Sequence, residues 1–175
     1  YNASFTTLTF TPNGLATETQ SFTVPVIGDS VFEPSETILA TLSSAADPAG
    51  TPTLSPAVAT GTIVNDDPAP RFSVSSTSVI EGVGLSNSTL TFSVTRDLDA
   101  QDPLTVAFAT SGNSATQGVD YSGVSGVLAF APGIFTQTFS VITIQDGLAE
   151  GNEDFLAVLS SPSGGASLGT ATGIG

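Results

Sequence analysis

Three acidic residues recur at one spacing in two short stretches of the chain. The pattern Asp-x-x-x-Glu-x-x-Glu appears twice, and each member of the second set lies 117 positions after its counterpart (146 minus 29, 150 minus 33 and 153 minus 36). The two sets are Asp29, Glu33, Glu36 and Asp146, Glu150, Glu153. Clustered carboxylates on loops supply the hard oxygen ligands that Ca²⁺ prefers, and neither set has the acid and glycine positions of an EF-hand loop. The repeated spacing therefore predicts two calcium sites. Simple solvation is the alternative, and it is strongest for Glu33 and Glu150.

The composition favours a folded protein whose partners are cations. Of the 175 residues 39% are hydrophobic, which is too many for a disordered chain despite a net charge of −14. The chain has two cationic residues, Arg71 and Arg96, and 16 acidic ones. This composition excludes a basic surface for nucleic acid or anionic lipid. The absence of Cys and His excludes disulfides and thiolate or imidazole metal sites. The apolar runs are shorter than the ~20 residues of a membrane span, so we expect no direct membrane insertion.

Alternation of apolar and polar residues predicts an all-β sandwich. Segments such as "LTFSVTR" and "TFSVITI" have period two and are separated by Gly, Pro, Asn and Ser turns. Phe10 and Phe130 lie on the alternating face and are predicted to be core residues, with Tyr121 packed at a strand edge. For Arg71 and Arg96 we expect surface or local ion pairs.

An internal repeat defines the domain organisation. "LTFTPNG" at 8–14 matches "LAFAPG" at 128–133, and the period suits one immunoglobulin-sized sandwich per copy. We therefore expect residues 1–67 to be the C-terminal part of a first sandwich, 68–70 a Pro-rich connector, and 71–175 a nearly complete second sandwich. These copies are called the first and second repeats below.

The first repeat lacks about three strands. Its predicted strands lie at about 6–11, 19–26, 37–43 and 57–64, and nothing in it matches residues 71–120 of the second repeat. Its apolar faces need strands from preceding sequence or from another chain. The expected partners are therefore neighbouring repeats or subunits in a linear assembly.

Six motifs in order carry a resemblance to a known family. They are "IEGVG", "VTR", "GVDY", "LAFAPG", the second acidic set and "LSSPSGGASLG", and together they resemble the Calx-beta repeat over essentially the whole chain. The resemblance implies tandem seven-stranded immunoglobulin-like sandwiches that bind Ca²⁺ through acidic loops at one end. Such repeats are found in sodium-calcium exchangers, integrin beta-4 and bacterial surface proteins.

The resemblance also implies a ligand set for each repeat. The first set is Asp29, Glu33, Glu36, Asp66 and Asp67, and the second is Glu81, Asp120, Asp146, Glu150 and Glu153. These ten residues are most of the 16 acids in the chain. Family members often have paired aspartates where this chain has Asp29-Ser30 and Asp146-Gly147, which implies fewer or weaker ions per site.

We expect a non-enzymatic, calcium-stiffened structural or adhesive module of an extracellular or cell-surface tandem-repeat protein or fibre. One alternative is a calcium-sensing regulatory domain of a membrane protein. A remote alternative is a glycosidase that uses a carboxylate pair from one of the acidic sets, such as Glu33 with Glu36 or Glu150 with Glu153. The absence of Trp, His, Lys and Cys counts against an enzyme.

Overall fold

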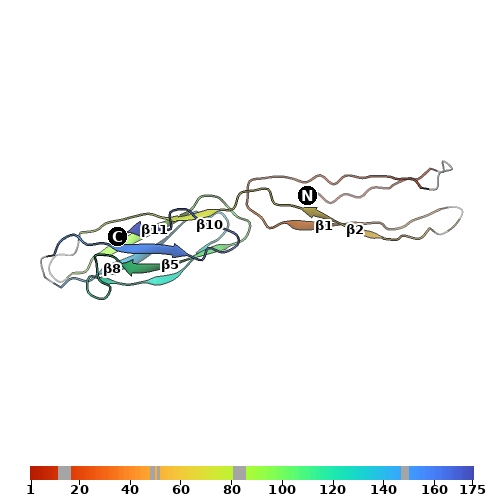
Figure 1. Ribbon diagram of the computed structural model, residues 1–175. Coiled ribbons are helices and arrows are strands. Elements are labelled where there is room, and N and C mark those ends of the chain that lie inside the picture. The colour runs from red at the N-terminus through yellow and green to blue at the C-terminus, as the bar shows by residue number, and fades with distance from the viewer. Residues whose placement is uncertain (12–16, 48–49, 51, 81–85, 147–149) are drawn as a thin grey trace. The chain divides into compact units, whose positions relative to one another are not determined.

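The protein is built from β-strands, which confirms the predicted all-β fold class (Figure 1). The computed structural model describes residues 1–11, 17–47, 50, 52–80, 86–146 and 150–175. The chain divides into two compact units. The first unit contains Tyr1–Ser30 and Ser35–Val64, and the second unit contains Val31–Pro34 and Asn65–Gly175. Among the residues described, no helix is long and apolar enough to cross a membrane.

The second unit is a sandwich of two sheets. Its strands are β3 (Arg71–Val74), β4 (Thr89–Arg96), β5 (Leu104–Gly112), β6 (Tyr121–Ser122), β7 (Ser125–Phe130), β8 (Thr136–Thr143), β9 (Phe155–Ser160), β10 (Ser167–Leu168) and β11 (Thr172–Ile174). One sheet has the order β10-β3-β4-β8-β6, and the other has the order β11-β9-β5-β7. The pairs are antiparallel except for β10 with β3, which run parallel. This arrangement is the immunoglobulin-like architecture that the sequence predicts.

The core lies between the two sheets, where the alternating residues meet. On β4 the buried apolar side chains are Leu90, Phe92 and Val94, and the residues between them face outward. On β9 of the other sheet Phe155 and Leu159 are buried in the same way. The rings of Phe92 and Phe155 meet edge to face with their centroids 5.8 Å apart. Period-two alternation therefore sets which side chains form the core.

Arg96 is buried because it occupies the last inward-facing position of β4. Its Nη2 forms an ion pair with Asp99, and its guanidinium carbon lies 5.2 Å from the ring centroid of Phe135. The backbone N–H groups of Gly133 and Ala100 also donate to the Asp99 carboxylate, and they are the main cause of its lowered pKa. The ion pair is local, as predicted: the Arg96 side chain is buried, and the Asp99 side chain is partly exposed.

A tetrapeptide from the first acidic stretch packs within the second unit. Phe32 forms a parallel bridge with Ala100: its N–H donates to the Asp99 carbonyl at 3.3 Å, and its carbonyl accepts from the Gln101 N–H at 3.0 Å. The half-buried Phe32 side chain packs against the core of this unit. Val31–Pro34 therefore belongs structurally to the second unit, although the repeat comparison assigns it to the first repeat.

Among its described residues, the first unit contains one antiparallel strand pair, β1 (Glu36–Thr41) with β2 (Val58–Ile63). The strands predicted at 6–11 and 19–26 are not formed. In the second repeat these stretches correspond to β7 and β8, which pair with β5 and β4, and residues 1–64 contain no counterpart of those partners.

Phe10 shows the same effect on a single side chain. It is 55% exposed, whereas its counterpart Phe130 is completely buried, so the prediction that Phe10 is a core residue is wrong for this unit. The alternating pattern is present at Phe10, but the covering sheet is missing.

Candidate metal centre

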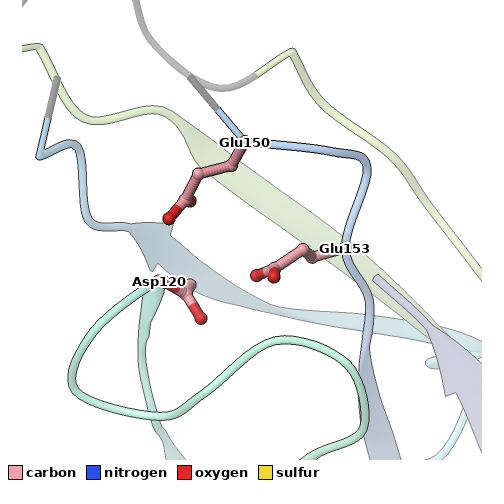
Figure 2. Close-up of side chains that lie close together, drawn as sticks. All are labelled: Asp120, Glu150 and Glu153. Carbon is pink, nitrogen blue, oxygen red and sulfur yellow. The ribbon is translucent and has the colours of Figure 1, made fainter. Parts of the chain in front are cut away.

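Three of the predicted ligands lie together at one end of the second unit. One carboxylate oxygen from each of Asp120, Glu150 and Glu153 lies within 4.8 Å of the others. Figure 2 shows the three side chains around a common space. Asp120 immediately precedes β6, and the two glutamates lie on the segment that leads into β9. The cluster therefore combines two segments that are about thirty residues apart in sequence.

Core packing explains why these two segments meet. Tyr121 follows Asp120 directly, and Phe155 lies two residues after Glu153. The Tyr121 and Phe155 rings are both buried and stack with their centroids 4.3 Å apart. Because this stack joins the starts of β6 and β9, the acids that precede each strand are held at the same end of the sandwich.

The backbone around Asp120 fixes its carboxylate. The Thr116 N–H donates to Asp120 Oδ2 at 2.6 Å, and the Asp120 N–H donates to the Thr116 carbonyl at 2.9 Å. The Asp120 carbonyl accepts from the Ile144 N–H of the loop after β8 at 2.8 Å. Asp120 is therefore held in a closed turn that is hydrogen-bonded to the loop after β8.

The geometry of the cluster suits a single calcium ion. Ca²⁺ binds six to eight oxygens at about 2.3–2.6 Å, so two oxygens on opposite sides of one ion are at most about 5 Å apart. The limit of 4.8 Å for this cluster satisfies that condition. Three carboxylates provide up to six oxygens, and backbone carbonyls or water can complete the shell. Without a cation, three adjacent carboxylates repel one another.

Two other ligands are predicted for the second repeat, Asp146 and Glu81. Asp146 is on the loop that follows β8, and it is not among the three carboxylates that lie within 4.8 Å of one another. Glu81 lies outside the residues that the structure describes.

The predicted ligands of the first repeat are divided between the two units. Asp29 and Glu36 belong to the first unit, whereas Glu33, Asp66 and Asp67 belong to the second. The whole set remains a prediction, and one part of it can be described within the second unit.

Asn65 connects two of the backbone segments that carry these acids. Its Oδ1 accepts from the backbone N–H of Glu33 at 3.3 Å and from that of Asp67 at 3.4 Å, and its Nδ2 donates to the Asp67 carbonyl at 3.1 Å. Asn65 is not among the predicted ligands, because an amide adds no charge to an acidic cluster.

Asp154 is likewise absent from the predicted ligands. Its carboxylate accepts hydrogen bonds from the turn that follows β5, with Ser114 as the main partner. The Ser114 hydroxyl is also the largest cause of the lowered pKa of Asp154. Comparison of the repeats could not find this residue, since its counterpart in the first repeat is Thr37 (154 minus 117).

The chain matches a known domain family. The family model described as the Calx-beta domain matches residues 1–68 and again residues 64–173. The crystal structure of the apo form of the Calx CBD1 domain is similar, with 28% identity and a TM-score of 0.55, over 61% of this chain and 96% of that one. CBD12 from CALX1.2 has 29% identity and a TM-score of 0.53, over 59% of this chain and 43% of that one.

A further similar structure is the calcium binding domain CBD12 of CALX1.1, with 29% identity, a TM-score of 0.53, and coverage of 59% of this chain and 44% of that one. This chain thus spans less than half of each CBD12 structure and nearly all of CBD1. Since the two matched regions together cover almost all of its length, the chain belongs to the Calx-beta family, whose cofactor is Ca²⁺.

Proposed function

We propose that the second repeat binds Ca²⁺ through Asp120, Glu150 and Glu153, with Asp146 and Glu81 as additional ligands. The observation that carries this proposal is the convergence of three carboxylates from two segments, within the distance that one ion can span. In a chain with 16 acids, chance could bring two together at the surface. The buried stack of Tyr121 on Phe155 instead builds this group into the sandwich.

We propose a second site in the first repeat, formed by Asp29, Glu33, Glu36, Asp66 and Asp67. Support comes from the repeated spacing of the acids and from Asn65, which connects the backbones of Glu33 and Asp67. An ion held there would lie where the first repeat ends, immediately before Pro68.

Thermal unfolding tests calcium binding by the second repeat. A ligand that binds only the folded state adds RT ln(1 + [L]/Kd), which is about 2.7 kcal/mol at a hundredfold excess over Kd. We therefore expect the melting temperature to rise by several degrees when chelator is replaced by millimolar Ca²⁺. Glu153→Gln should reduce this rise. Asp102→Asn should preserve it, because that exposed acid precedes β5 and is not part of the cluster. An unchanged melting temperature for the unmodified chain would refute the proposal.

Two biological settings follow from calcium binding. We propose an extracellular structural or adhesive role, in which ions stiffen a tandem array of repeats, because the family model matches the chain twice in succession. The second candidate is a calcium-sensing regulatory domain, and the similarity to the calcium binding domain CBD12 of CALX1.1 favours it.

Calcium affinity separates these two settings. Extracellular modules bind with Kd values of about 10⁻⁴–10⁻³ M, whereas sensors bind at about 10⁻⁷–10⁻⁵ M. A calorimetric Kd of about 10⁻⁴–10⁻³ M supports the structural role, and a Kd of about 10⁻⁵ M or lower supports the sensor.

We also propose that the chain is not an enzyme. A glycosidase needs one protonated carboxyl group to act as the acid and a second, ionised group beside it. Three carboxylates around one space favour a cation over such a pair. Hydrolysis of aryl glycosides by the chain, abolished by Glu150→Gln, would contradict this proposal.

A further inference from the structure

Asp154 connects the two segments that supply the acidic cluster. It directly follows Glu153, and its Oδ1 accepts three hydrogen bonds from the turn after β5. The donors are Asn113 Nδ2 at 3.0 Å, the Ser114 N–H at 3.2 Å and the Ser114 hydroxyl at 2.6 Å. One oxygen of a non-cluster acid thus holds a turn that begins seven residues before Asp120.

Backbone hydrogen bonds close the same connection from the other side. The Asp154 N–H donates to Ser114 Oγ at 2.7 Å, so the hydroxyl both donates to Asp154 and accepts from it. The Asp154 carbonyl accepts from the Ala115 N–H at 2.8 Å, and the Ala115 side chain is buried. The turn is therefore fixed to the start of β9 through both the side chain and the backbone of one residue.

This turn leads directly into the one that holds Asp120. Thr116 follows Ala115, and its N–H donates to Asp120 Oδ2 while its carbonyl accepts from the Asp120 N–H. A continuous chain of contacts thus runs from Asp154 through Ser114 and Thr116 to Asp120. Its two ends adjoin Glu153 and Asp120, which come from different segments of the cluster.

We infer that Asp154 is a positioning residue for the calcium site, where it holds the Asp120 turn against the segment that carries Glu150 and Glu153. This inference rests on the proposed calcium binding by the second repeat. Asp154 is not one of the three carboxylates that lie within 4.8 Å of one another, and its Oδ1 accepts from donors of residues 113 and 114.

Two substitutions separate positioning from charge. Ser114→Ala removes the hydroxyl that bridges to Asp154 and leaves the net charge unchanged. Asp154→Asn removes one negative charge and weakens the same contacts. Substitution of residues that orient metal ligands typically weakens metal binding by about 10- to 100-fold. We therefore expect either variant of the full chain to raise the calorimetric Kd for Ca²⁺ by about tenfold or more. The double variant should be little worse than the weaker-binding single variant, because both changes break one connection.

Three controls define the outcome. Ser114→Thr keeps the hydroxyl and should restore binding, and Asp102→Asn should leave the Kd within about twofold of the unmodified chain. Thermal unfolding in chelator reports a purely structural effect, which would lower the melting temperature without changing the Kd. A Kd within about twofold for Ser114→Ala, while Glu153→Gln loses binding, would overturn the inference and leave the proposed function intact. Absence of calcium binding by the unmodified chain would overturn both.

Discussion

Replacing Phe155 with Ala tests whether the aromatic stack holds the metal end of the second unit together. The Phe155 ring is 4% exposed, stacks on Tyr121 at 4.3 Å and meets Phe92 edge to face at 5.8 Å. Burial of such a ring contributes about 1.5–3 kcal/mol, and each aromatic pair adds about 0.5–1.5 kcal/mol. We therefore expect the free energy of unfolding to fall by about 3–5 kcal/mol, which is the usual range for a buried Phe→Ala substitution.

Tyrosine fluorescence during urea unfolding in chelator is a suitable assay. Tyr121 is buried and Tyr1 is exposed, so the change in signal reports the second unit. Phe5→Ala is the matched control, because Phe5 is 99% exposed and its loss should change stability by less than about 0.5 kcal/mol. If Phe155→Ala prevents folding, Phe155→Leu gives the same direction with a smaller loss. A loss below about 1.5 kcal/mol for Phe155→Ala would refute the role assigned to the stack.

Three further predictions concern other parts of the second unit. Phe32→Ala should lower its urea stability by about 1 kcal/mol, since the half-buried ring packs on the core; no change would show that this contact is not formed in solution. Gly173→Ala should lower the melting temperature, because a Cβ there would lie 2.7 Å from the Ser75 carbonyl oxygen, and a neutral effect would contradict the close approach of β11. The pKa of Asp154 is lowered in the folded state, so its stabilising effect is present above the unfolded pKa and is lost as pH falls through the folded value. In chelator, urea stability should therefore decline below about pH 4 less steeply for Asp154→Asn than for the unmodified chain, and parallel declines would contradict this.

The fold was predictable where alternation and pairing partners occur in the same repeat. β4 and β8 coincide with predicted alternating segments, and their inward residues form part of the core. The stretches 6–11 and 19–26 have the same pattern but form no strands. A strand needs a neighbouring strand to pair with, and residues 1–64 contain no counterpart of β5 and β4, the pairing partners in the second repeat. Sequence periodicity identifies the face of a strand, and only the neighbouring strands decide whether that face becomes buried.

The candidate site was predictable in its acids and not in its supports. The repeated spacing and the family resemblance select Asp120, Glu150 and Glu153, which the structure brings together. Asp154 supports this site through hydrogen bonds to residues 40 and 41 positions away, and in the predicted first-repeat set Asn65 is hydrogen-bonded to Glu33, 32 positions away. No local pattern encodes such contacts. Spacing within a stretch therefore indicates which residues can ligate, while the tertiary fold determines which residues hold them.

The most direct test of the account is to locate the ion. Crystals of the full chain grown with millimolar Ca²⁺, or with Tb³⁺ as a substitute, should show an anomalous peak about 2.3–2.6 Å from carboxylate oxygens of Asp120, Glu150 and Glu153. A structure in which these three side chains are well ordered with no peak between them would contradict the central claim.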